Sequence, residues 1–259
     1  MKKKIFNSLV CVLSSSVVLA AGAGETPKSS SQTAAPQTQA AKPSFDAAGK
    51  KIVFGSKTLE VCPSGFIRLM TAGKLTANFY IYADTPYSPW ISNQKQNVTL
   101  PNPYGRNLGT DSVTADEKTQ TITVKGKTPY HKKNEAEIVG EYLLTVRLLD
   151  SGKAAIHFEY TVPAKAEKGF MVMHCVSPGA QKFFRDGKEC KFPENKKWDF
   201  MRKPGTFRVV SGDPAETFEL TITSGNNAFA VPNKGFHISR NTPDKANPNR
   251  FVTDLEIKP

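Results

Sequence analysis

Apolar and polar residues alternate with a period of two in many stretches of the chain, and the helical period of 3.6 is almost absent. The stretches 75–82 and 121–124 follow this pattern, which is typical of β-strands with one buried face. Two further runs, 142–148 and 156–162, flank the turn sequence Asp150-Ser151-Gly152. The sequence therefore predicts a long β-hairpin here.

Further strands are expected in the second half of the chain, at 170–176, 207–210, 218–223, 228–231, 235–239 and 251–257. Turn-forming residues separate them, and the chain holds 18 Gly and 18 Pro. Many short strands punctuated in this way indicate an all-β fold. We predict an antiparallel β-sandwich of the supersandwich or jelly-roll-like kind.

The first 43 residues differ from the rest. Lys2, Lys3 and Lys4 precede an apolar run that ends at the small residues Ala21-Gly22-Ala23. This layout predicts a bacterial signal peptide at residues 1–23 and a periplasmic or secreted protein. Residues 24–43 are rich in Ser, Thr, Gln, Ala and Pro, which is typical of a flexible linker. We expect a single β-sandwich domain at 44–259, with no membrane span after cleavage.

Charge and cysteine content limit the partners of this domain. Residues 1–43 hold five Lys and one Glu, so the domain keeps 30 basic and 22 acidic residues, a net charge of +8. This excess suits an anionic polysaccharide, an envelope surface or nucleic acid, although it also serves solubility.

Three cysteines remain after cleavage, and Cys175 and Cys190 are the pair that we expect to form a disulfide, with Cys62 as a competitor. The cysteines and the four scattered histidines lack metal-ligand spacing, so we expect neither a metal nor a cofactor.

Two segments carry candidate ligand contacts. Between residues 84 and 110, Tyr87, Trp90 and Tyr104 lie among amide and guanidinium donors, a mixture that suits sugars. Between residues 182 and 208, cations alternate with aromatic residues, and Arg185 and Trp198 are the contacts that we select. The second segment would equally suit single-stranded nucleic acid, which we rank below polysaccharide. Ordinary packing and a solvated charged surface remain the alternatives for both segments.

The signals for catalysis are sparse. His174, in a predicted strand, is a weak acid/base candidate, and a hydrogen-bonded core histidine is the alternative. His157 and Glu159 lie two positions apart on one strand face, where an acid/base pair and a surface pair are both open. The sequence contains no G-x-S-x-G, no Gly-rich phosphate loop and no H-E-x-x-H.

Three segments together carry a resemblance: the hairpin EYLLTVRLLDSGKAAIHFEYTVP, the strand FMVMHCVSP and the turn RDGKECKFPE. In rhythm they resemble the large β-sandwich (supersandwich) domains related to galactose mutarotase, over about residues 141–194. Such domains occur as enzymes and as non-catalytic modules of exported carbohydrate-active proteins. The resemblance implies this fold and a carbohydrate context. Mutarotases use a His and a Glu at the sugar; His174 is the one candidate here, and no Glu matches.

Three hypotheses follow. The first is an exported β-sandwich protein that binds carbohydrate, possibly an anionic polysaccharide. The second is a polysaccharide-processing enzyme (lyase, hydrolase or epimerase) on the same scaffold, with His174 as acid or base. The third is an envelope-associated structural or interaction protein, which an exposed apolar patch or an unpaired sheet edge would favour.

Overall fold

The structure of the chain is a computed structural model. It describes residues 42–63, 66–84, 109–130, 138–161, 170–193, 199–201, 205–224, 227–231, 235–240, 246–247 and 249–259. The residues from Ala40 to Pro259 form one compact unit. The predicted signal peptide, residues 1–23, and most of the predicted linker lie outside the described residues.

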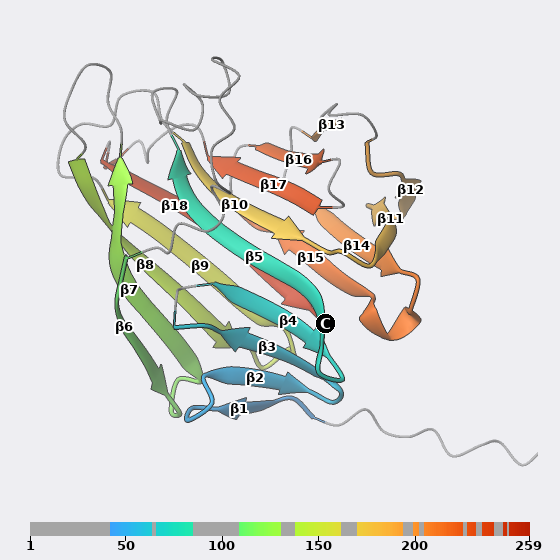
Figure 1. Ribbon diagram of the computed structural model, residues 1–259, viewed down its shortest axis with the longest axis horizontal. Coiled ribbons are helices and arrows are strands. Elements are labelled where there is room, and N and C mark those ends of the chain that lie inside the picture. The colour runs from blue at the N-terminus through green and yellow to red at the C-terminus, as the bar shows by residue number, and fades with distance from the viewer. Residues whose placement is uncertain are drawn as a thin grey trace, which may run out of the picture. The chain divides into compact units, whose positions relative to one another are not determined.

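The described strands form two nine-stranded antiparallel sheets (Figure 1). In the first sheet, the strands follow the order β1-β2-β3-β4-β5-β10-β17-β16-β13. Their bounds are β1 (Ser44–Asp46), β2 (Lys51–Phe54), β3 (Lys57–Val61), β4 (Ile67–Thr71), β5 (Lys74–Asp84), β10 (Phe170–Val176), β13 (Asp199–Met201), β16 (Asn227–Val231) and β17 (Gly235–Arg240). The first five strands are thus consecutive in sequence, while the later part of the sheet returns from the second half of the chain.

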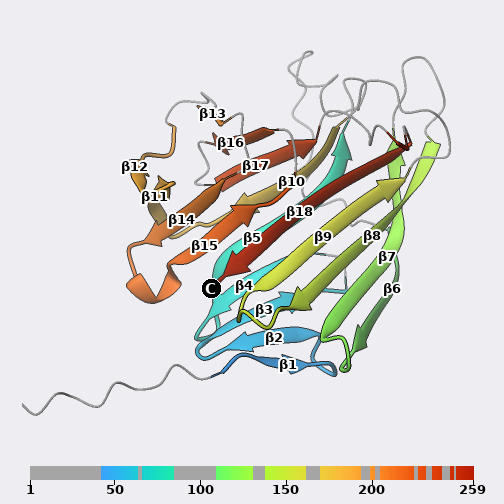
Figure 2. The same ribbon diagram turned by 180° about the vertical axis from the view of Figure 1, so that it is seen from behind.

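The second sheet lies in front in Figure 2 and has the order β12-β11-β14-β15-β18-β9-β8-β7-β6. Its strands are β6 (Gly109–Asp116), β7 (Thr121–Tyr130), β8 (Ile138–Leu148), β9 (Ala154–Thr161), β11 (Ala180–Arg185), β12 (Lys188–Cys190), β14 (Thr206–Ser211), β15 (Phe218–Ile222) and β18 (Arg250–Lys258). A short 3-10 helix, η2 (Pro214–Glu216), connects β14 to β15. Within the described residues, we find no helix with the length and hydrophobicity needed to span a bilayer.

One hydrophobic core joins the inner faces of the two sheets. Phe236 on β17 of the first sheet has its ring centroid 5.1 Å from that of Phe183 on β11 and 5.1 Å from that of Phe207 on β14, both in the second sheet. All three rings are essentially inaccessible to solvent. Two antiparallel sheets that bury their inner faces against each other constitute a β-sandwich, so the predicted fold class is confirmed.

The long hairpin predicted from the alternation pattern is also confirmed. β8 and β9 pair with Leu144 opposite Phe158 and Thr145 opposite His157. The inner residues of β9 are buried, and the alternate residues are half-buried on the outer face. Within the turn sequence RDGKECKFPE, Asp186 and Gly187 join β11 to β12 with positive φ angles of 49° and 82°, which is the backbone that a two-residue hairpin turn requires. The pairing of β8 with β9 and the turn between β11 and β12 therefore set which residues of these strands lie on the outer face of the second sheet.

Candidate functional site

Four of the five predicted ligand contacts lie outside the described residues: Tyr87, Trp90, Tyr104 and Trp198. The fifth, Arg185, lies at the end of β11, half-buried. Its guanidinium carbon is 5.9 Å from the centroid of the core ring of Phe207, and its Nε is 3.6 Å from Asp186 Oδ2. Arg185 thus lies close to a core ring and has an acidic partner within the protein. Its role as a ligand contact stays a prediction.

His174 lies on β10, in the middle of the first sheet. The next residue, Cys175, is completely buried in the core between the sheets. Because successive residues of a strand point to opposite faces, His174 takes a position on the outer face of this sheet. The role of His174 as an acid or base and the alternative of a hydrogen-bonded core histidine both stay predictions.

The predicted disulfide between Cys175 and Cys190 does not form in the structure, where both residues and Cys62 are free thiols. Cys175 lies on β10 in the first sheet, and Cys190 ends β12 at the edge of the second sheet. Their proximity in sequence is misleading because the chain changes sheets between them. Burial raises the pKa of the Cys175 thiol, which keeps it protonated and unreactive.

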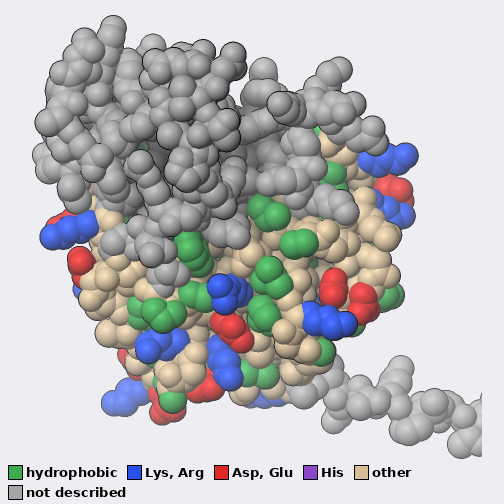
Figure 3. Space-filling view, in the orientation of Figure 1, with side chains coloured by type: hydrophobic (Ala, Val, Ile, Leu, Met, Phe, Trp, Pro, Cys, Tyr) green, Lys and Arg blue, Asp and Glu red, His purple; other side chains and the backbone are tan. Residues whose placement is uncertain are grey.

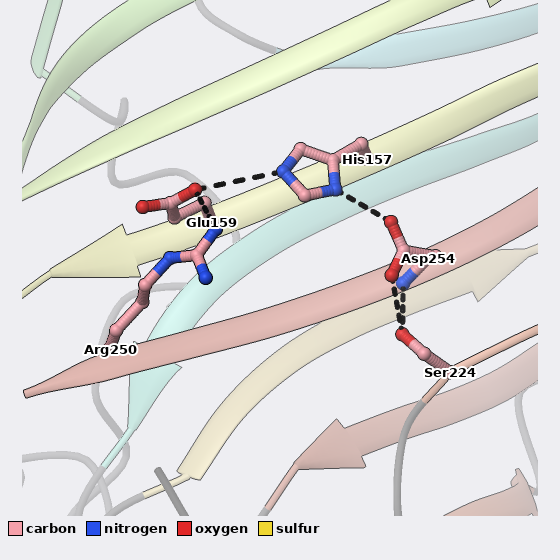
Figure 4. Close-up of polar contacts among 5 residues, drawn as sticks. All are labelled: His157, Glu159, Ser224, Arg250 and Asp254. Atoms are coloured by element: carbon pink, nitrogen blue, oxygen red, sulfur yellow. Dashed lines mark hydrogen bonds and ion pairs between the residues drawn. The ribbon is translucent and has the colours of Figure 1, made fainter. Parts of the chain in front are cut away.

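Neighbouring strands of the second sheet bring together a polar cluster on its outer face, formed by His157, Glu159, Ser224, Arg250 and Asp254 (Figure 4). We call these five residues the His157 cluster. β9 supplies His157 and Glu159, and β18 supplies Arg250 and Asp254. Asp254 is directly opposite His157 in the strand register. Alternation places all four strand residues outward, since their chain neighbours, such as Phe158 and Leu255, are buried.

His157 is held between two carboxylates. Its Nδ1 is 2.6 Å from Asp254 Oδ1, and its Nε2 is 3.7 Å from Glu159 Oε2. The hydrogen bond with Asp254 raises the pKa of His157 above its ordinary value of 6.5. The guanidinium of Arg250 donates to Glu159 across 2.6 Å, and this bond lowers the pKa of Glu159 below its ordinary value of 4.5. The cluster therefore favours a charged histidine between ionised carboxylates.

The hydrogen bonds of Ser224 decide whether the cluster resembles a catalytic triad. Ser224 Oγ donates to Asp254 Oδ2 at 2.7 Å and accepts from the Asp254 backbone N–H at 2.8 Å. In a Ser-His-Asp triad, the histidine must take the proton of the serine. Here the carboxylate of Asp254 lies between Ser224 and His157, so the arrangement is wrong for a serine nucleophile. The cluster is a polar network that links β18 to β9. This arrangement favours the surface pair over the acid/base pair as the role of His157 and Glu159.

The His157 cluster should give the protein a pH-dependent stability. Because folding raises the pKa of His157, its contribution is complete below about pH 6.5 and is lost as the pH rises through the higher value of the folded state. Glu159, with its lowered pKa, contributes above about pH 4.5 and loses this contribution as the pH falls. We expect His157→Gln to cost about 0.5–1 kcal/mol near pH 6 and less near pH 9.

Urea denaturation at several pH values, on the wild type and His157→Gln, tests this expectation. The matched control is Lys153→Gln, which removes the nearby 2.9 Å bond to Glu256 from the same sheet face and leaves the His157 cluster intact. The control should keep the pH slope of the wild type. An unchanged slope in His157→Gln would show that the cluster does not hold the protonated histidine.

A second feature of the same sheet face combines an aromatic ring with cations. Phe184 on β11 has the Nζ of Lys182 at 5.4 Å and the guanidinium carbon of Arg208 at 6.0 Å from its ring centroid. We call these three residues the Phe184 patch. Phe183, next in the chain, is buried, so Phe184 belongs to the outer face, opposite Arg208 on β14. Lys182 also donates to Glu189 across 2.7 Å, whereas Arg208 is exposed.

The outer face of the first sheet has a different composition over β1 to β5. Figure 3 shows Lys and Arg side chains interspersed with Asp and Glu there, between hydrophobic side chains. Lys51 Nζ, for example, is 3.5 Å from Asp46 Oδ2. Mixed charges of this kind give no single-sign surface for an anionic ligand. Across the described part of the chain, we also find no group of three or more His, Cys, Asp or Glu able to hold a metal ion.

Known proteins resemble this chain in three-dimensional structure but not in sequence. No protein-family model and no curated protein sequence matches the chain. A 4-alpha-glucanotransferase from Thermococcus litoralis superposes with a TM-score of 0.52 at 9% identity, over 84% of this chain and 40% of that one. A glycosyl hydrolase family 38 protein from Enterococcus faecalis gives 0.51 at 7% identity, over 82% of this chain and 30% of that one.

A GalM/aldose epimerase homologue from C. elegans gives a TM-score of 0.41 at 11% identity, over 83% of this chain and 98% of that one. This chain thus spans less than half of the first two proteins. At such low identities the likeness concerns the fold alone, and function must be argued from sites. At that level, the resemblance to β-sandwich domains of carbohydrate-active proteins is confirmed.

Proposed function

We propose that this protein is exported and binds carbohydrate, and that its ligand is a polysaccharide with anionic groups. The observation that carries the proposal is the Phe184 patch, where an aromatic ring has two cations close to it on the outer face of the second sheet. The fold supports it, since domains of similar fold occur in a 4-alpha-glucanotransferase and a glycosyl hydrolase family 38 protein. The signal-peptide pattern supports a periplasmic or secreted location.

The chemistry of the Phe184 patch suits an acidic sugar. A phenyl ring covers the apolar C–H face of a pyranose, while a guanidinium binds a carboxylate or sulfate through two parallel hydrogen bonds. Arg208 is exposed and can supply this fork, and Lys182 adds a second positive charge. The strand register places Arg208 directly opposite Phe184, so the two side chains leave neighbouring strands side by side.

A glycan-array screen on the purified protein, at low and moderate salt, tests the proposal. We expect binding to sulfated or uronic glycans that weakens as salt rises, since salt screens exposed charges. Phe184→Ala and Arg208→Gln should each weaken this binding about tenfold, which corresponds to about 1.4 kcal/mol. Arg208→Gln should also reduce the dependence on salt.

Lys125→Gln is the matched control. It removes an exposed cation of β7 from the same sheet, several strands away from the Phe184 patch, and should leave binding unchanged. Salt-insensitive binding to neutral glycans would overturn the anionic preference and would direct attention to residues 84–110. The absence of binding to any glycan would overturn the carbohydrate proposal and favour a structural or interaction protein.

A further inference from the structure

The Phe184 patch is one end of a row of residues that crosses the outer face of the second sheet. Arg208 on β14 is directly opposite Glu219 on β15, and Glu219 is directly opposite Lys258 on β18. Figure 2 shows β11, β14, β15 and β18 side by side in this sheet. Beside Phe184, the register therefore places a cation, an acid and a second cation in line. We call Arg208, Glu219 and Lys258 the charged row.

The side chains of the charged row are directed away from the core and have no ionic partner within the described part of the chain. Residues next to them in the sequence, such as Val209 and Ile257, are buried between the sheets, so alternation directs the charged row outward. Arg208 and Lys258 are exposed, and Glu219 is half-buried. The ion pairs between described residues involve none of the three. Their charges are therefore available to a ligand.

The spacing of the charged row matches a polysaccharide that lies across the strands. Neighbouring strands are about 4.8 Å apart, which is close to the length of one pyranose unit in a polysaccharide chain. Arg208 and Lys258 leave the sheet two strands apart, so they correspond to two sugars with a third sugar between them. The carboxylate of Glu219 lies at this middle position, where it can accept hydrogen bonds from hydroxyls and repels another carboxylate.

We propose that the ligand is a polysaccharide in which acidic and neutral sugars alternate. Phe184 packs against the first acidic sugar, and Arg208 binds its acidic group. Glu219 accepts hydrogen bonds from the hydroxyls of the neutral sugar that follows, and Lys258 binds the acidic group of the third sugar. This inference rests on the proposed function and adds to it the spacing of the acidic groups. Glu219 is thus a specificity-determining residue, because it disfavours a polymer with an acidic group on every sugar.

Equilibrium binding of the purified protein to two polymers at low salt tests the proposal. Hyaluronan alternates acidic and neutral sugars, whereas every sugar of polygalacturonate is acidic, and we expect the wild type to bind hyaluronan more tightly. Glu219→Gln should raise the affinity for polygalacturonate about threefold to fivefold, the size of an exposed charge–charge interaction, and should largely keep hyaluronan binding. Lys258→Gln should weaken hyaluronan binding by a similar factor.

Glu141→Gln is the matched control for Glu219→Gln, because Glu141 is an exposed acid on β8 of the same sheet, outside the charged row. It should leave both affinities unchanged. Three results would each overturn the alternating ligand: wild-type binding to polygalacturonate as tight as to hyaluronan, an unchanged polygalacturonate affinity in Glu219→Gln, or full hyaluronan affinity in Lys258→Gln. In these cases the wild type still binds an acidic glycan, so the carbohydrate proposal stands. If neither polymer binds, the alternating ligand is also overturned, and the glycan array decides the carbohydrate proposal separately.

Discussion

Replacing Phe183 by alanine is expected to lower the free energy of unfolding by about 3–5 kcal/mol, among the largest effects of any single substitution in the core. Phe183 is completely buried and is the centre of an aromatic cluster that bridges the sheets. Its ring centroid lies 5.0 Å from that of Phe192, 6.3 Å from that of Phe207 and 5.1 Å from that of Phe236. An alanine would leave a cavity that strands held in two sheets cannot close.

The neighbouring residue supplies the control for this experiment. Phe184→Ala removes the same ring from the next position of β11, where it is half-buried on the outer face. We expect a cost below about 1 kcal/mol, as for most surface substitutions. Urea denaturation followed by circular dichroism measures both variants, and equal midpoints for the two would contradict the assignment of inner and outer faces. The comparison also shows whether Phe184→Ala is folded, which its use in the glycan screen requires.

The sequence predicts the strands of this fold where alternation is regular. On β9 and β18, the inward residues are apolar except for Thr253, and the outward residues are mostly polar, so the period of two is plain. The strands in residues 44–71 escaped prediction because they are only three to five residues long, too short for a periodic signal. β12 and β13 have three residues each and are defined by their pairing with β11 and β16. Such pairing depends on the tertiary structure and cannot be inferred from the local sequence.

Sequence analysis of the sites fails where topology decides which strands are neighbours. We predicted a Cys175–Cys190 disulfide because these cysteines are close in sequence, but they belong to different sheets. Conversely, the four histidines are scattered along the chain, and yet the pairing of β10 with β17 places the backbone of His174 directly opposite that of His237. The pairing of His157 with Glu159 could be predicted from their spacing on one strand, whereas their partners on β18 could not. Long-range strand order carries information that local patterns lack.

Replacing Gly235 by alanine should also destabilise the protein strongly, for a reason opposite to that of a cavity. Gly235 lies on β17 directly opposite Val176 on β10. An alanine Cβ would collide with the carbonyl oxygen of Cys175 and lie 3.2 Å from both the Cys175 carbonyl carbon and Val176 Cα. These backbone atoms belong to the paired strand and have no rotamer by which to move away. We therefore expect a loss of about 3 kcal/mol, the upper part of the range for overpacked sites.

Gly212→Ala is the matched control for this clash. There the nearest atom to the new Cβ is Gln181 Nε2 at 2.9 Å, the end of a flexible exposed side chain that can rotate away. We expect a change within about 0.5 kcal/mol, and the same denaturation assay measures both glycine variants. If Gly235→Ala were as stable as Gly212→Ala, β10 and β17 could not be paired in this register. This stability measurement therefore tests the register of β10 and β17 directly.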